Sequence, residues 1–66
     1  MTDREIGQWL KTAREERELS CQEVGKFLGV NRSNIWRWEN AKVSIPLPRL
    51  VQLVQLYRLD GSVIFK

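Results

Sequence analysis

A helix start, a helix stop and a second helix start follow one another within residues 19–31, LSCQEVGKFLGVN. Ser20 is a good N-cap residue, and Glu23 three positions later can bond back to its amide, which would make a capping box. Gly29 can adopt the left-handed conformation that ends a helix. Asn31 is a second N-cap candidate. The segment therefore predicts a short helix, a tight turn and another helix.

The rest of the chain also has the apolar spacing of helices. Apolar residues recur every three or four positions, and no alternating segment of strand length occurs. The expected helices span residues 3–17, 21–28 and 32–40, with a fourth that begins at Pro48 and a last short turn after Asp60. The residues expected to face the core are Ile6, Trp9, Leu10, Ala13, Val24, Phe27, Leu28, Ile35, Trp38, Leu50, Leu53, Val54 and Tyr57. We expect an all-α fold, a compact bundle of about five short helices that forms one domain over residues 1–66.

The chain lacks the cross-links that often stabilise domains of its size. Its 66 residues include one cysteine, which cannot form an internal disulfide, and no histidine. A structural zinc site and histidine-based catalysis are therefore not expected. No segment resembles a signal peptide, and no apolar run approaches the roughly 18 to 20 residues that cross a bilayer. We expect a cytoplasmic domain that is not an enzyme and has no metal, cofactor, small-molecule substrate or membrane partner.

Basic residues are concentrated in the second part of the chain. Residues 1–24 carry four basic and six acidic residues, whereas residues 25–66 carry seven basic and two acidic ones. Such an asymmetry favours a polyanionic partner on one side of the molecule. A solvated basic surface explains the charge count equally well, so the charge alone does not identify the partner.

These motifs, in this order, resemble the DNA-binding domain of the phage lambda and 434 repressors and Cro. The elements that carry the resemblance are the LSxxEV start, the FLGV helix end and turn, the SxIxRWENxK helix and the proline before the fourth helix. The resemblance runs from about Ile6 to Phe65. It implies a helix-turn-helix whose second helix, around residues 32–40, lies in the major groove of a double-stranded DNA operator. It also implies a sequence-specific transcription regulator, a homodimeric repressor from a phage or bacterium. A helix-turn-helix protein-interaction module, such as an antitoxin or adaptor, is the alternative.

The resemblance assigns base reading to the outward face of the helix over residues 32–40. With Ile35 and Trp38 turned inward, a rotation of about 100° per residue puts the other face toward solvent. The expected base-reading residues are Arg32, Ser33, Trp36 and Arg37. An arginine there can meet guanine N7 and O6 together. Solvated arginines on an exposed helix are the alternative. Trp36 could press on a thymine methyl or a sugar edge, or pack on Arg32 as a cation–π pair.

Phosphate contacts are expected near helix ends, where amides without partners and the helix dipole favour anions. The residues assigned to this role are Ser20, Cys21, Gln22, Arg14, Asn40 and Lys42. Cys21 stands where the family usually has glutamine. A thiol at a helix N-terminus also suggests a redox sensor, although an incidental small residue explains it better.

Two further expectations come from the resemblance. Arg14 and Glu39 match a pair that forms a salt bridge between the first and third helices, with two independently solvated charges as the alternative. The expected dimer interface consists of Val51, Leu56, Ile64 and Phe65, residues that could instead close the core of the monomer.

Ala41 departs from the family pattern, because it occupies the usual glycine site after the third helix. Either it adopts a left-handed conformation at a cost of roughly 1–2 kcal/mol, or the loop bends differently.

Overall fold

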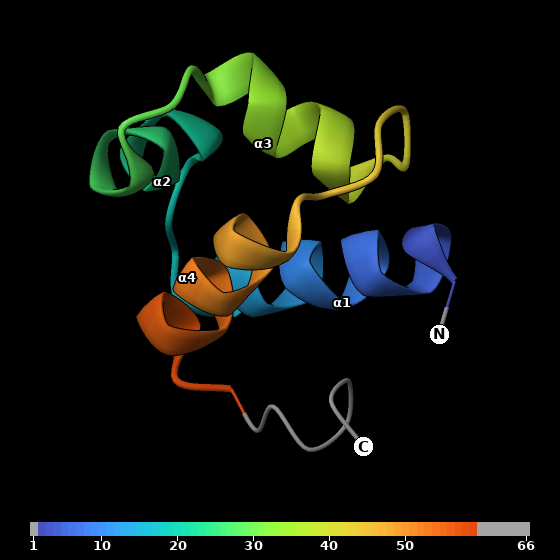
Figure 1. The fold of residues 1–66 in the computed structure, drawn as a ribbon. Coiled ribbons are helices and arrows are strands. Elements are labelled where there is room, and N and C mark those ends of the chain that lie inside the picture. Colours follow the sequence, from blue (N-terminus) through green and yellow to red (C-terminus); the bar gives the residue numbers. More distant parts are fainter. Residues whose placement is uncertain (1, 60–66) are drawn as a thin grey trace.

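Four helices make up the part of the chain that the computed structural model describes, residues 2–59 (Figure 1). They are α1 (Asp3–Glu16), α2 (Cys21–Leu28), α3 (Arg32–Glu39) and α4 (Leu47–Tyr57). Helix α1 packs against both α3 and α4, and α2 packs against α3. The all-α class is confirmed. The described helices number four rather than about five, and the turn expected after Asp60 lies outside the described residues.

The starts of α2 and α3 follow the capping signals in the sequence. The amide of Glu23 donates to the Ser20 hydroxyl at 3.1 Å, and the amide of Ser20 donates to the Glu23 carboxylate at 3.0 Å. This reciprocal pair is the predicted capping box. Asn31 caps α3, because its side chain accepts a hydrogen bond from the amide of Ser33. Gly29 is left-handed, with φ 71°, and ends α2 as predicted.

The starts of α1 and α4 differ from each other. Helix α1 has a second capping box, between Thr2 and Glu5, and the TDRE segment carries the same spacing as the box of α2. Helix α4 has no side-chain cap. It begins at Leu47, one residue before the predicted start at Pro48, and a proline is tolerated in this first turn because amides there lack helical partners.

Each of the four described helices is followed, within two residues of its end, by a residue with positive φ, and three of these residues are not glycine. They are Glu18 (φ 55°), Ala41 (φ 54°) and Arg58 (φ 56°). After α3, the amide of Ala41 donates to the Trp38 carbonyl and the amide of Lys42 donates to the Arg37 carbonyl, which is the Schellman pattern. Ala41 therefore takes the strained left-handed conformation rather than a different bend.

The core consists of apolar residues from all four helices. The buried apolar residues are Leu10, Ala13, Val24, Leu28, Ile35, Trp38, Leu50, Leu53, Val54 and Tyr57, as the spacing predicts. Ile6 and Trp9 are partly buried and pack against this cluster. The prediction for Phe27 is wrong, since its side chain is 67% exposed. Val24 and Leu28 lie one turn apart and both face inward, which turns Phe27 about 100° away from the core.

Two glycines allow backbone segments to approach closely. A Cβ on Gly7 would lie 2.7 Å from the carbonyl oxygen of Trp38 and closer still to that of Glu39. A Cβ on Gly25 would lie 2.7 Å from the carbonyl oxygen of Val30. Real Cβ atoms do not approach so closely, so glycine sets how near α1 lies to the end of α3 and α2 to the following turn.

We predict that Ala41→Gly raises the free energy of unfolding by roughly 0.5–1 kcal/mol. The substitution removes left-handed strain of roughly 1–2 kcal/mol, and the greater entropy of the unfolded chain offsets part of that gain. Denaturant titration measures the difference. The control Thr12→Gly, at an exposed position inside α1, should instead lower stability by roughly 0.3 kcal/mol, since glycine is a poorer helix former than threonine. A less stable Ala41→Gly variant would show that Ala41 is not left-handed.

Candidate nucleic-acid interface

One face of α3 points to solvent and carries the four residues expected to read bases, which we call the α3 face: Arg32, Ser33, Trp36 and Arg37. Arg32, Trp36 and Arg37 are exposed, and Ser33 is half-buried. Ile35 and Trp38 are buried on the opposite side. Trp36 and Trp38 therefore have different roles: Trp38 belongs to the core, whereas the Trp36 side chain is 51% exposed.

The N-terminus of α2 lies beside the α3 face. A shallow hollow is lined by Cys21 of α2 together with Arg32, Ser33 and Trp36 of α3. The capping box uses the amides of Ser20 and Glu23, and the amide of Val24 donates to the Ser20 carbonyl. Among the described residues, the amides of Cys21 and Gln22 have no such partner. These two amides and the positive end of the helix dipole form a surface that favours an anion.

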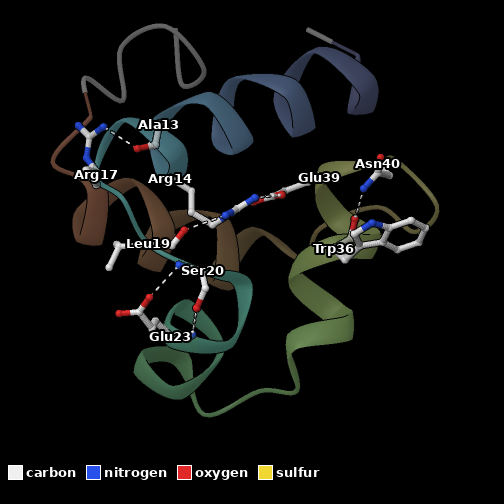
Figure 2. Close-up of polar contacts among 9 residues, drawn as sticks. All are labelled: Ala13, Arg14, Arg17, Leu19, Ser20, Glu23, Trp36, Glu39 and Asn40. Carbon is white, nitrogen blue, oxygen red and sulfur yellow. Dashed lines mark hydrogen bonds and ion pairs between the residues drawn. The ribbon is translucent and has the colours of Figure 1, made fainter.

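A second polar surface lies at the opposite end of α3. Asn40 and Lys42 are exposed and share a hollow with Glu39 and with Arg4 and Gln8 of α1. The Asn40 side-chain amide donates to the Trp36 carbonyl at 2.9 Å, which fixes its position at the helix end (Figure 2). Arg4 and Gln8 were not predicted from the sequence. Their spacing of one helical turn, on the side of α1 away from its apolar stripe, is the signal that could have found them.

Arg14 and Glu39 form an ion pair between α1 and the end of α3 (Figure 2). Arg14 donates from Nε to Glu39 Oε2 at 2.8 Å and from Nη2 to Oε1 at 3.1 Å, and its Nη1 donates to the Leu19 carbonyl at 2.7 Å. The side chains are 13% and 3% exposed. The hydrogen bonds to Glu39 raise the pKa of Arg14, so the guanidinium stays charged. Because Glu39 is neutralised internally, it does not offset the exposed cations of α3.

Two other arginines stabilise helix ends. Arg17 donates to the carbonyls of Tyr57 and Ala13 at 2.8 Å each, and its guanidinium carbon lies 5.8 Å from the centroid of the Tyr57 ring. Arg49 donates to the Leu28 carbonyl at 3.0 Å, at the end of α2. Cations are favourable at such positions, because the last carbonyls of a helix lack partners.

The cation–π pair considered for Trp36 is not formed. Within residues 2–59, the contact of this kind is that of Arg17 with Tyr57, and Arg32 makes none with Trp36.

The residues expected at a dimer interface are only partly described. Val51 and Leu56 of α4 are half-buried, and Ile64 and Phe65 lie outside the described residues. Val51 lines a surface hollow with Pro46, Leu47 and Pro48 at the start of α4.

Residues 5–64 match the protein family described as the helix-turn-helix domain. The chain belongs to this family. The match spans all of α2, α3 and α4 and most of α1. Helices α2 and α3, which pack together and are joined by residues 29–31, have the helix-turn-helix arrangement. In DNA-binding motifs of this kind the second helix lies in the major groove, and the first crosses the backbone. Neither the curated proteins nor the solved structures that were compared with the chain gave a match.

Within the described part of this helix-turn-helix domain, none of the helices is both long and apolar enough to cross a membrane. The same residues hold no group of three or more acidic or cysteine side chains placed to bind a metal ion.

Cys21 of the helix-turn-helix domain lies in surroundings that raise the pKa of its thiol. It is half-buried, and burial, followed by the nearby charge of Glu39, raises its pKa. Arg14 and Lys11 act in the opposite direction but do not outweigh burial. Reactive cysteines have lowered pKa values, so this environment argues against a redox sensor.

We predict that Arg14→Ala lowers the free energy of unfolding by roughly 2–4 kcal/mol, because it leaves the Glu39 carboxylate buried without its partner. Urea titration measures the change. The double variant Arg14→Met with Glu39→Leu replaces both charges with apolar groups of similar size and should recover most of the loss. An Arg14→Ala variant as stable as the unchanged domain would mean that the two charges act independently in solvent.

We predict that Cys21 is alkylated with a higher pH midpoint in the folded domain than in the same chain unfolded in urea. The raised pKa keeps the thiol protonated at neutral pH, and only the thiolate reacts. Iodoacetamide rates across a pH series give both midpoints. A folded-state midpoint at or below that of the unfolded chain would restore the sensor hypothesis.

Proposed function

We propose that this helix-turn-helix domain is a sequence-specific double-stranded DNA-binding transcription regulator that reads the major groove with α3. The observation that carries the proposal is the α3 face: α3 exposes two arginines, and one of them, Arg32, shares a hollow with Cys21 at the N-terminus of α2. In such complexes the N-terminal residues of that helix contact base edges. Arginine is the residue best suited to guanine, since two of its donors match N7 and O6.

Each residue has a distinct part in the proposed complex. Arg32, Ser33, Trp36 and Arg37 read bases. Ser20, Cys21 and Gln22 hold one phosphate at the start of α2, and Asn40 and Lys42 hold another at the end of α3. Arg4 and Gln8 share the second hollow and extend this phosphate contact. Arg14 holds α3 in place through Glu39, with its phosphate contact secondary because three of its donors already bond within the domain.

We further propose a dimeric repressor of the lambda, 434 and Cro type, from a phage or bacterium. Two-fold dimers of this type bind half-sites about one DNA turn apart, roughly 34 Å. Val51 and Leu56 would contribute to the interface together with Ile64 and Phe65. The domain would act in the cytoplasm by binding alone, without catalysis, metal or cofactor.

Selection of bound sequences from a random pool of duplex DNA tests the proposal. A palindrome with half-sites about one turn apart should be enriched. Absence of any enriched sequence would exclude a sequence-specific regulator, and a single unrepeated site would exclude the dimer.

We predict that Arg37→Ala weakens binding to the selected operator by roughly tenfold to a hundredfold, because one bidentate contact contributes roughly 1–3 kcal/mol of discrimination. Arg58→Gly is the matched control, since it removes the same charge at the end of α4 and relieves a left-handed residue. The control should bind nearly as well as the unchanged domain in gel-shift titrations. Equal losses in the two variants would mean that net charge, rather than the α3 face, determines affinity.

A protein-interaction module is the second candidate, because large apolar side chains lie on the surface. Phe27 is 67% exposed and Leu47 is 60% exposed. Apolar residues of this size often anchor protein interfaces. Salt distinguishes the two functions: affinity for DNA falls steeply with salt concentration, whereas an apolar protein interface changes little.

A further inference from the structure

The hollow between α2 and α3 differs in chemistry from the rest of the basic surface. Its lining consists mainly of apolar atoms, from Cys21, Arg32, Ser33 and Trp36. Burial keeps the Cys21 thiol protonated, so the hollow contains no anion. Arg32 contributes to its wall and is the charged residue among the four. A mainly apolar depression, with Arg32 as its charged residue, therefore lies within a surface that otherwise favours anions.

The position of the hollow relative to the anion-binding amides determines what can enter it. Cys21 belongs both to the hollow and to the start of α2, where the amides of Cys21 and Gln22 favour a phosphate. Because Cys21 belongs to both, a nucleotide whose phosphate was held there would lie near the hollow. The phosphate itself would bind the amides of Cys21 and Gln22 at the edge of the hollow rather than enter it, since burying an anion against carbon atoms is unfavourable.

The major groove of DNA presents one apolar group, the C5-methyl of thymine. Arg32, in the wall of the hollow, also supplies a positive charge that can approach the DNA phosphates or a neighbouring guanine. We propose that the hollow formed by Cys21, Arg32, Ser33 and Trp36 receives the C5-methyl group of a thymine in each half-site. Trp36 and Cys21 are then specificity-determining residues that select thymine at one position next to the guanines read by arginine.

This inference rests on the proposed function and gives Trp36 its role. An indole that is 51% exposed on a helix surface is unfavourable in water, and a methyl group from DNA would cover part of it. The contact also explains how a chain with cysteine at the start of α2 can bind specifically there, since the thiol offers an apolar surface and the backbone amides take the phosphate.

Uracil tests the proposal, because it differs from thymine only in lacking the methyl group. Each thymine of the selected operator is replaced by uracil in turn, and affinities are measured by gel shift. At one thymine per half-site, uracil should weaken binding about fourfold, the effect of leaving one methyl group out of an apolar contact. Trp36→Ala should bind the thymine and uracil operators nearly equally. Cys21→Ser, which makes the hollow more polar without changing its size greatly, should reduce the ratio between them.

Arg37→Ala is the control variant, since it lowers affinity but should keep the thymine-to-uracil ratio. Circular dichroism establishes that each variant is folded, and Cys21→Ser tests the inference if Trp36→Ala does not fold. A domain that rejects scrambled DNA yet binds the all-uracil operator as tightly as the thymine operator would overturn the inference and leave the proposed function intact. Unchanged ratios in both Trp36→Ala and Cys21→Ser would also overturn it. No sequence preference at all would refute the proposed function itself.

Discussion

The ion pair between Arg14 and Glu39 joins the two helices whose relative position determines the surface of the domain. It can form because Gly7 lets α1 approach the carbonyls at the end of α3, where a larger residue would clash. Buried charges are unfavourable without partners, and here each is satisfied by two hydrogen bonds in the pair, with a third from Arg14 to the Leu19 carbonyl. The close backbone contact and the ion pair therefore depend on each other.

The orientation of α3 follows from contacts at both of its ends. Asn31 caps its start after the Gly29 turn, which sets its angle to α2. Glu39 anchors its end to α1, and the left-handed Ala41 turns the chain toward α4. The exposed Arg37 lies on the side of α3 away from the buried Ile35, so its direction depends on the same contacts. A surface suited to DNA is thus produced by helix ends rather than by the exposed residues alone.

Local signals in the sequence were sufficient for the starts of α2 and α3 and for the two tryptophans. The capping box at Ser20 and the rotation of about 100° per residue that separates Trp36 from Trp38 depend only on neighbouring residues. Phe27 could not be placed in the same way, because Val24 and Leu28 compete with it for the inward face. The close approach at Gly7 depends on α3, which is distant in sequence, so no local pattern indicates it.

The claim that α3 reads the major groove is tested most directly by methylation interference on the selected operator. Guanine N7 lies in the major groove, and adenine N3 lies in the minor groove. We expect methylation of guanine N7 to abolish binding at one or two positions in each half-site, and methylation of adenine N3 to have little effect. Interference confined to adenine N3, or absent at every guanine, would contradict the proposed placement of α3.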